Sequence, residues 1–125
     1  MESLTPGTEG TAVWILSGAE HYFRGHFPDQ PLVPGVLMVE SIAQLAGIVV
    51  QSARLENPLL NVRLTAIRQF KIGGTVPPPA TLRVHARIDG SMGGLIQASG
   101  TVTDMATGNL LATGAIVLSG KEPTA

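Results

Sequence analysis

Residues 34–50 read PGVLMVESIAQLAGIVV, an almost wholly apolar run that contains one carboxylate, Glu40. Proline is tolerated at the start of a helix but not inside one, and Leu, Met, Ala and Glu are good helix formers. The run therefore predicts a helix that begins at Pro34-Gly35, continues to about Arg54 and ends before Asn57-Pro58. A helix that is apolar all round must be covered on several sides, so we expect the carboxylate of Glu40 to be buried with it, which is costly for an unpaired group.

The segments on either side of this helix are rich in strand-forming residues. The clearest alternation runs from Leu82 to Asp89, where apolar side chains alternate with Arg, His and Asp. A curved antiparallel sheet wrapped around the helix would cover it, which predicts an α+β domain of two layers with its last four strands in meander-like succession. The expected strands are residues 11–17, 61–72, 82–89, 95–104 and 109–119.

Length, charge and composition narrow the function classes. A chain of 125 residues is long enough for one domain, in which we expect residues 1–10 and 120–125 to be flexible. A net charge of −1 gives no basic footprint for nucleic acid, and the absence of cysteine excludes thiol catalysis. His21, His26 and His85 lack carboxylates or thiols at ligand spacing, so no metal site is predicted.

Membrane and export signals are weak. The uninterrupted apolar parts of residues 32–50 are shorter than the roughly 20 residues that a bilayer requires. The first residues have neither a basic nor an apolar region of the kind that signal peptides carry. We therefore expect a buried helix without membrane insertion, in a cytoplasmic protein.

Proton-transfer chemistry is indicated by a small set of polar residues around the helix start. His26 lies in a loop stiffened by Gly and Pro, and Gly35 places its N–H among the unpaired donors of the first helical turn. That helix end carries partial positive charge and would polarise a carbonyl oxygen. Glu40 lies further along the helix, with Gln44 on the same face. An acid, a base and an electrophilic donor suit removal of a proton α to a carbonyl while a β-hydroxyl leaves.

Each of these residues also has a structural interpretation. A loop histidine such as His26 is often structural, and Gly35 after a proline is often simply a helix start. Gln44 could bond the backbone, and His85 is expected on the surface. The aromatic residues are expected in the core or at an interface rather than around a cofactor: Trp14, Phe23 and Phe70.

The motif that joins these residues resembles a known family. Residues 22–28 read YFRGHFP, residues 31–37 read PLVPGVL and residues 40–44 read ESIAQ. Together they closely resemble the signature of the FabZ-type (3R)-hydroxyacyl-acyl carrier protein dehydratases. That family has the hotdog fold, in which a curved antiparallel sheet wraps a long central helix. Weaker similarity continues through residues 64–76, so the resemblance covers most of the chain from about Thr11.

The resemblance implies a role for each matching residue. His26 would be the general base or acid at Cα, and Glu40 would protonate the departing 3-hydroxyl. The N–H of Gly35 would bind the thioester carbonyl, and Gln44 would help to orient Glu40. The motif neighbours Phe27 and Pro34 would support the site. No cofactor is implied, because the substrate arrives on the phosphopantetheine arm of acyl carrier protein.

The resemblance also implies partners. In the family, the histidine and the glutamate of one site come from different subunits, which predicts a homodimer with shared sites, or a trimer of such dimers. The acyl tunnel would then follow the dimer interface. Acyl carrier protein is acidic, and the candidates for docking it are Arg24, Arg68 and Lys71.

Two departures from the family pattern leave alternatives open. Family members usually begin some twenty residues earlier than this chain, and here PPPA at residues 77–80 replaces the usual Pro-Gly-Asp turn. A dehydratase that forms the trans-2-enoyl thioester is favoured over the isomerising subfamily, which typically has aspartate in place of Glu40. A thioesterase, or an acyl-binding subunit without turnover, is the alternative function on this fold.

Overall fold

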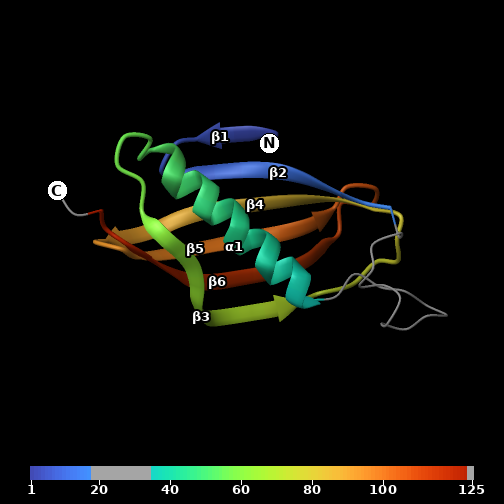
Figure 1. Ribbon diagram of the computed structural model, residues 1–125. Coiled ribbons are helices and arrows are strands. Elements are labelled where there is room, and N and C mark those ends of the chain that lie inside the picture. The colour runs from blue at the N-terminus through green and yellow to red at the C-terminus, as the bar shows by residue number, and fades with distance from the viewer. Residues whose placement is uncertain (18–34, 124–125) are drawn as a thin grey trace.

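The computed structural model describes residues 1–17 and 35–123, which form one antiparallel sheet and one long helix (Figure 1). The helix, α1, begins at Gly35 as predicted and ends at Ser52, two residues short of the expected end. The elements in chain order are β1 (Ser3–Thr5), β2 (Glu9–Leu16), α1 (Gly35–Ser52), β3 (Leu60–Ile72), β4 (Ala80–Met92), β5 (Leu95–Asp104) and β6 (Leu110–Lys121).

The sheet has the strand order β1-β2-β4-β5-β6-β3, so the prediction of four strands in succession is wrong for β3. Among the last four strands, β4, β5 and β6 pair with their sequence neighbours, whereas β3 pairs with β6 at the edge of the sheet. The physical reason lies in residues 73–79, a Gly- and Pro-rich link that is too long for a tight hairpin. This link carries the chain across to β4, which lies beside β2 (Figure 1).

The N-terminal residues differ from the flexible segment that we expected. Ser3 pairs with Thr11, and the N–H of Glu2 donates to the carbonyl of Thr11 at 2.7 Å. β2 accordingly begins at Glu9, two residues before the predicted start. Among the described strands, the short strand β1 pairs along one edge, with β2. At the other end of the chain, β6 continues to Lys121.

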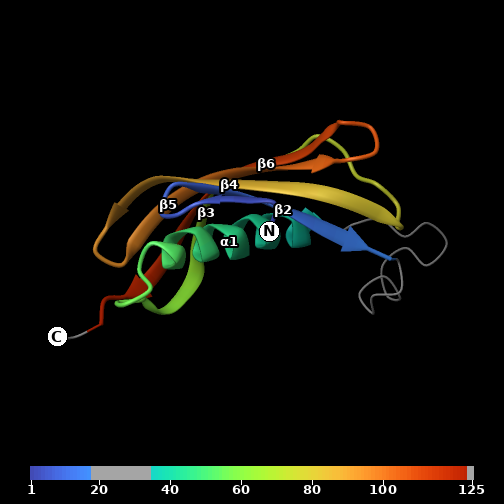
Figure 2. The same ribbon diagram turned by 90° about the horizontal axis from the view of Figure 1, so that it is seen from above.

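Helix α1 lies against the concave face of the curved sheet, and the two layers enclose the core (Figure 2). Ile42 is completely buried and packs directly on β5. A Cβ at Gly100 would lie 2.7 Å from the Cγ2 of Ile42, so glycine at this position permits the close approach of helix and strand. The buried helix residues are Met38, Val39, Ile42, Ala43, Leu45, Ala46, Val49 and Val50.

The opposite face of α1 is not covered by the other described residues, contrary to the expectation of a helix covered on several sides. Val36, Glu40, Gln44 and Ile48 follow one another at four-residue spacing along this face, and all four are exposed. A sheet that contacts the helix from one side covers only part of its circumference. By length and composition α1 could cross a membrane, but its buried face packs on the sheet as in a soluble core helix.

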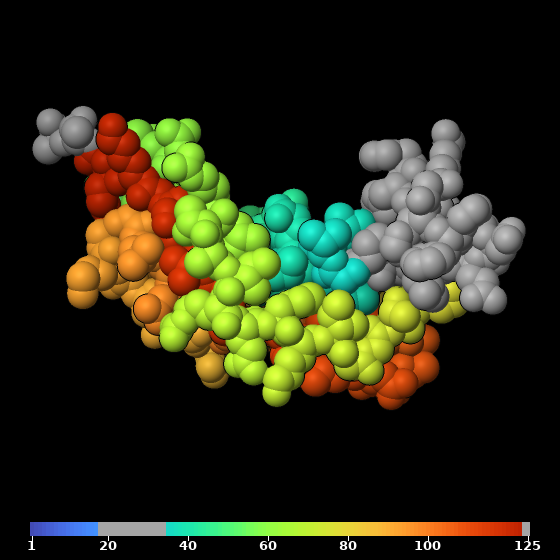
Figure 3. Space-filling model, turned by 90° about the horizontal axis from the view of Figure 1, so that it is seen from below, coloured from blue at the N-terminus to red at the C-terminus, as the bar shows by residue number. Residues whose placement is uncertain are grey.

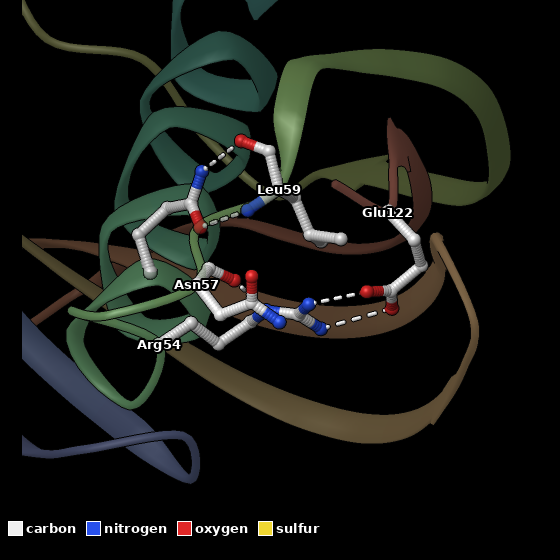
Figure 4. A network of polar contacts seen from close by, with 5 residues as sticks. Arg54, Asn57, Leu59 and Glu122 are labelled. Carbon is white, nitrogen blue, oxygen red and sulfur yellow. Dashed lines mark hydrogen bonds and ion pairs between the residues drawn. The ribbon is translucent and has the colours of Figure 1, made fainter. Parts of the chain in front are cut away.

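The C-terminal end of α1 is fixed to the sheet by two polar contacts (Figure 4). The side chain of Gln51 donates to the carbonyl of Leu59 at 2.9 Å and accepts from its N–H at 3.0 Å. Arg54 forms a bidentate ion pair with Glu122, with N···O distances of 3.1 and 2.5 Å. The hydrogen bond from Arg54 holds the pKa of the Glu122 carboxyl below its ordinary value. These contacts tie together the helix end, the start of β3 and the residue after β6.

Candidate functional site

The described residues contain part of the predicted site. Gly35, Glu40 and Gln44 all lie on α1 within its first three turns. His26 lies outside the described residues, and so do its motif neighbours and one docking candidate: Arg24, Phe27 and Pro34. The helix therefore carries two groups of the predicted site, the N–H of Gly35 and the carboxylate of Glu40. The role of His26 as the base remains a prediction.

Glu40 and Gln44 are joined directly on the uncovered face of α1. The Nε2 of Gln44 donates to the Oε1 of Glu40 at 3.3 Å, across one turn of the helix. This geometry follows from four-residue spacing, which places two side chains one above the other. The contact restricts the rotamers of the carboxylate and leaves its second oxygen, Oε2, without a protein donor among the described residues.

Glu40 is exposed in the single chain, which corrects the expectation that its carboxylate is buried. The reason is the one-sided packing of α1, which turns residues 36, 40, 44 and 48 away from the sheet. Solvent covers the carboxylate, so no burial penalty arises in the isolated chain. Any dry environment for Glu40 must come from outside the described residues.

A hollow of about 490 Å³ adjoins the carboxylate between α1 and β2, and we call it the Glu40 hollow. Its size falls within the usual range for small-molecule sites, roughly 300–1,000 Å³. Glu40, Ser41 and Gln44 supply its polar groups, and the other walls are apolar. Those walls are formed by Met1, Ala12, Trp14, Leu37, Leu45, Ile48 and Val84.

Gly35 begins the helix beside the end of β3. Its N–H belongs to the first turn, where backbone donors have no partner within the helix and the helix dipole is positive. A Cβ built on Gly35 would overlap the Cδ1 of Ile72, the last residue of β3. A larger residue at position 35 would therefore displace either the Cδ1 of Ile72 or the helix start.

The two docking candidates that the structure describes are both exposed on β3. The Nη1 of Arg68 donates to the Oε1 of Gln97 at 3.2 Å, which links β3 to β5 across β6. Lys71 lines a shallow hollow on the outer face of the sheet, together with His85 and Arg87. His85 was predicted at the surface; its side chain is 37% exposed, with its Nε2 3.7 Å from a carboxylate oxygen of Glu9.

Two residues beside the site escaped functional assignment from the sequence. Trp14 was assigned to the core or an interface, yet it is half-buried and lines the Glu40 hollow. Its position in β2, two residues before the buried Leu16, could have indicated that it faces the helix. Nothing in the sequence marked Ile72 as part of the site, because its contact with Gly35 joins segments that are distant in sequence.

Within residues 1–17 and 35–123, no three His, Cys, Asp or Glu side chains are grouped to hold a metal.

The arrangement of helix and sheet defines the class of protein. It is the α+β hotdog fold, and known structures share it closely. A chain of "The Dehydratase Heterocomplex ApeI:P" from Xenorhabdus doucetiae superimposes with a TM-score of 0.70 over 90% of this chain and 88% of that one, at 22% identity. The acetyl-CoA-bound protein smu.793 from Streptococcus mutans also gives a TM-score of 0.70, over 98% of this chain and 88% of that one, at 12% identity. At these identities the similarity establishes the fold alone.

Sequence comparison identifies the family within that class. The chain belongs to the ApeI-like dehydratase family, whose model it matches over residues 6–109. It is 37% identical over 99 residues to the 3-hydroxyacyl-[acyl-carrier-protein] dehydratase FabZ of Rickettsia bellii, covering 79% of this chain and 68% of that protein. The FabZ of Rickettsia felis is 43% identical over 84 residues, covering 67% of this chain and 58% of that protein. The predicted fold, the FabZ-type resemblance and the dehydratase class are confirmed.

Proposed function

We propose that this dehydratase converts (3R)-3-hydroxyacyl thioesters, carried by acyl carrier protein, into trans-2-enoyl thioesters. The observation that carries the proposal is the placement of Glu40, held by Gln44, one and a half turns from the N–H of Gly35 on the same helix. A thioester carbonyl at Gly35 would leave the 3-hydroxyl within reach of the carboxyl. The FabZ proteins of Rickettsia are named for this substrate class.

The reaction needs two proton transfers and one bond cleavage. In our proposal, His26 removes a proton from C2, whose acidity rises as the Gly35 N–H polarises the thioester carbonyl. The C2–H electron pair forms the C2=C3 double bond as the C3–O bond breaks. Glu40 donates a proton to the departing hydroxyl, which leaves as water. Exchange with solvent then returns His26 to its neutral form and Glu40 to its acid form. Protein side chains suffice for these steps, so the proposal includes no cofactor.

We infer that two copies of the chain form the complete site. Two observations support association: β3 is an edge strand of 13 residues, and α1 leaves an apolar face beside it. Val36, Ile48 and Leu55 are 70%, 51% and 84% exposed, which is costly for side chains of this size in an isolated chain. A second hollow of about 640 Å³ lies between α1 and β3 and is lined by Ile48, Leu55 and Val62. A second subunit seated here would cover this face, and in our proposal the site at Glu40 is completed by the His26 of the other subunit.

The carrier protein is proposed to approach the β3 side of the sheet. Arg68 and Lys71 are exposed there, and Lys71 has no ion-pair partner among the described residues. Lys71 directly precedes Ile72, which contacts the helix start. A carrier bound at these cations would hold its thioester close to Gly35. We place the reaction in the cytoplasm, where acyl carrier protein substrates are made.

The test is an assay of the purified protein with 3-hydroxybutyryl-pantetheine, followed by enoyl absorbance and by free thiol. We expect enoyl formation without release of thiol. Release of free thiol would identify a thioesterase instead. Stable binding of the thioester without either product would identify an acyl-binding subunit that requires another chain.

A further inference from the structure

The start of α1 and the end of β3 are in direct contact through a glycine and an isoleucine. The Cδ1 of Ile72 occupies the space in which a Cβ of residue 35 would lie, and its Cγ1 lies 3.5 Å from that Cβ position. Figure 1 shows that the end of β3 lies beside the first turn of α1. The side chain of Ile72 therefore rests on the backbone of the residue whose N–H is proposed to bind the thioester carbonyl.

Ile72 is well suited to fix that backbone, because it is itself anchored in the sheet. It pairs with Ala112 of β6, and the N–H of the next residue, Gly73, donates to the carbonyl of Leu111 at 2.8 Å. Isoleucine is branched at Cβ, which restricts its first side-chain torsion. The Cβ and Cγ atoms of Ile72 are thus tied to the sheet, and its Cδ1, which the second side-chain torsion places, rests against the helix start.

Ile72 also presents apolar surface to a ligand. Although it contacts Gly35, its side chain remains 56% exposed, so only part of it is covered by the helix. The first turns of α1, in cyan, reach the surface on the side of the molecule that β3 borders (Figure 3). A thioester whose carbonyl oxygen meets the N–H of Gly35 would lie beside the uncovered part of Ile72.

We propose that Ile72 is a positioning residue for the thioester carbonyl, an inference that rests on the proposed dehydration. It would hold the N–H of Gly35 in place and form an apolar wall that keeps water from the polarised oxygen. Donors that stabilise a developing oxyanion act best when they are fixed in advance and shielded from water. Such a role predicts that the requirement for glycine at position 35 depends on the size of residue 72.

A cycle of four proteins tests this dependence: wild type, Gly35→Ala, Ile72→Ala and the double variant. Each is assayed for kcat and KM with 3-hydroxybutyryl-pantetheine. Removal of one oxyanion donor typically costs about 100-fold to 1,000-fold in kcat. Gly35→Ala keeps the N–H but would displace it from the carbonyl oxygen, so we expect a loss at the lower end of that range, about 100-fold. Ile72→Ala should lower kcat about tenfold with a smaller change in KM, since the donor is retained but less well fixed. The double variant should recover at least about tenfold in kcat over Gly35→Ala, because the overlap with Cδ1 is removed.

Two single variants on β3 show whether the effect is specific to the side chain of Ile72. Ile67→Ala removes an isoleucine that is 51% exposed on the same strand, so it should retain wild-type kcat if Ile72 acts through Gly35. Ile72→Val retains the branched Cβ but lacks the Cδ1 that contacts Gly35, so its kcat should lie between those of wild type and Ile72→Ala. Additive losses in the double variant, or equal losses in Ile67→Ala and Ile72→Ala, would overturn the inference. Inactive wild-type protein would instead contradict the proposed function. In that case the melting temperatures of the four proteins would show whether residues 35 and 72 are coupled through packing.

Discussion

The amide of Gln44 holds the carboxylate of Glu40 at 3.3 Å, and both side chains lie on the face of α1 that the sheet leaves uncovered. An exposed glutamate at this position would otherwise sample several rotamers, and the bond selects those in which one oxygen faces Gln44. The other oxygen is then free to meet a hydroxyl. The pair is thus an arrangement on the helix surface that needs no contribution from the sheet.

Replacing Gln44 by methionine tests that arrangement. The variant retains length and packing but cannot donate to Glu40, so kcat should fall about fivefold, with KM nearly unchanged, as expected for the loss of one such bond. Gln69→Met provides a matched control, because Gln69 is exposed on β3 away from the helix face. Equal kcat values for Gln44→Met and wild type would show that Gln44 does not orient the carboxylate.

Mixing two inactive variants tests whether the site is shared between subunits. His26→Ala and Glu40→Ala should each lower kcat by at least about 100-fold, as for loss of a general acid or base. If each site combines residues from two subunits, random exchange in an equimolar mixture should restore about a quarter of the wild-type activity. A mixture that exchanges subunits, as shown by mass-tagged chains, yet stays inactive would place both residues of a site in one chain.

A docking role for Arg68 and Lys71 should affect KM for the carrier-bound substrate but not KM for a small substrate. Reversing charge in Arg68→Glu and Lys71→Glu should raise KM for 3-hydroxybutyryl-acyl carrier protein by a few-fold each, the size typical of exposed charge pairs. KM for 3-hydroxybutyryl-pantetheine should not change, because that substrate lacks the acidic protein. The difference should shrink in high salt as exposed charges are screened. Parallel increases in KM for both substrates would argue against a docking role.

The sequence predicted the local features of this protein well, and the failures involve long-range packing. The start of α1 at Gly35 and the whole of β5 follow from turn residues and periodicity in the chain itself. The place of β3 beside β6 could not be read from the same signals, because strand pairing depends on contacts between distant segments. Glu40 was predicted to be buried because an apolar run was taken to mean a helix surrounded on several sides. The contact between Gly35 and Ile72 likewise depends on how helix and sheet meet.

The ion pair between Arg54 and Glu122 should make stability depend on pH at the acidic end. The hydrogen bond from Arg54 lowers the pKa of Glu122 below its ordinary value of 4.5, so its stabilisation is present above that pH in the folded protein. It is lost as the pH falls through the lowered pKa. Glu122→Gln should therefore lower the melting temperature by roughly one to three degrees at pH 7, and the difference from wild type should disappear at acidic pH below the lowered pKa. Glu56→Gln, an exposed control next to the same loop, should not lower it at either pH.

Trp14 offers a direct report on the Glu40 hollow, because it is the single tryptophan of the chain and lines that hollow with Glu40 and Gln44. A half-buried indole changes its emission when water beside it is replaced by an apolar group. Titration with crotonyl-pantetheine, the enoyl product of the assay substrate, should therefore shift the emission to shorter wavelength with saturation. Because Glu40→Ala leaves the indole in place, it should show the same wavelength shift despite its loss of turnover.

A control lies on the outer face of the sheet, which should not contribute to binding of the small product. Lys71→Ala should therefore give the wild-type titration. Saturable inhibition of turnover by the product without any change in emission would place the bound acyl group outside the Glu40 hollow, on the β3 side of the helix.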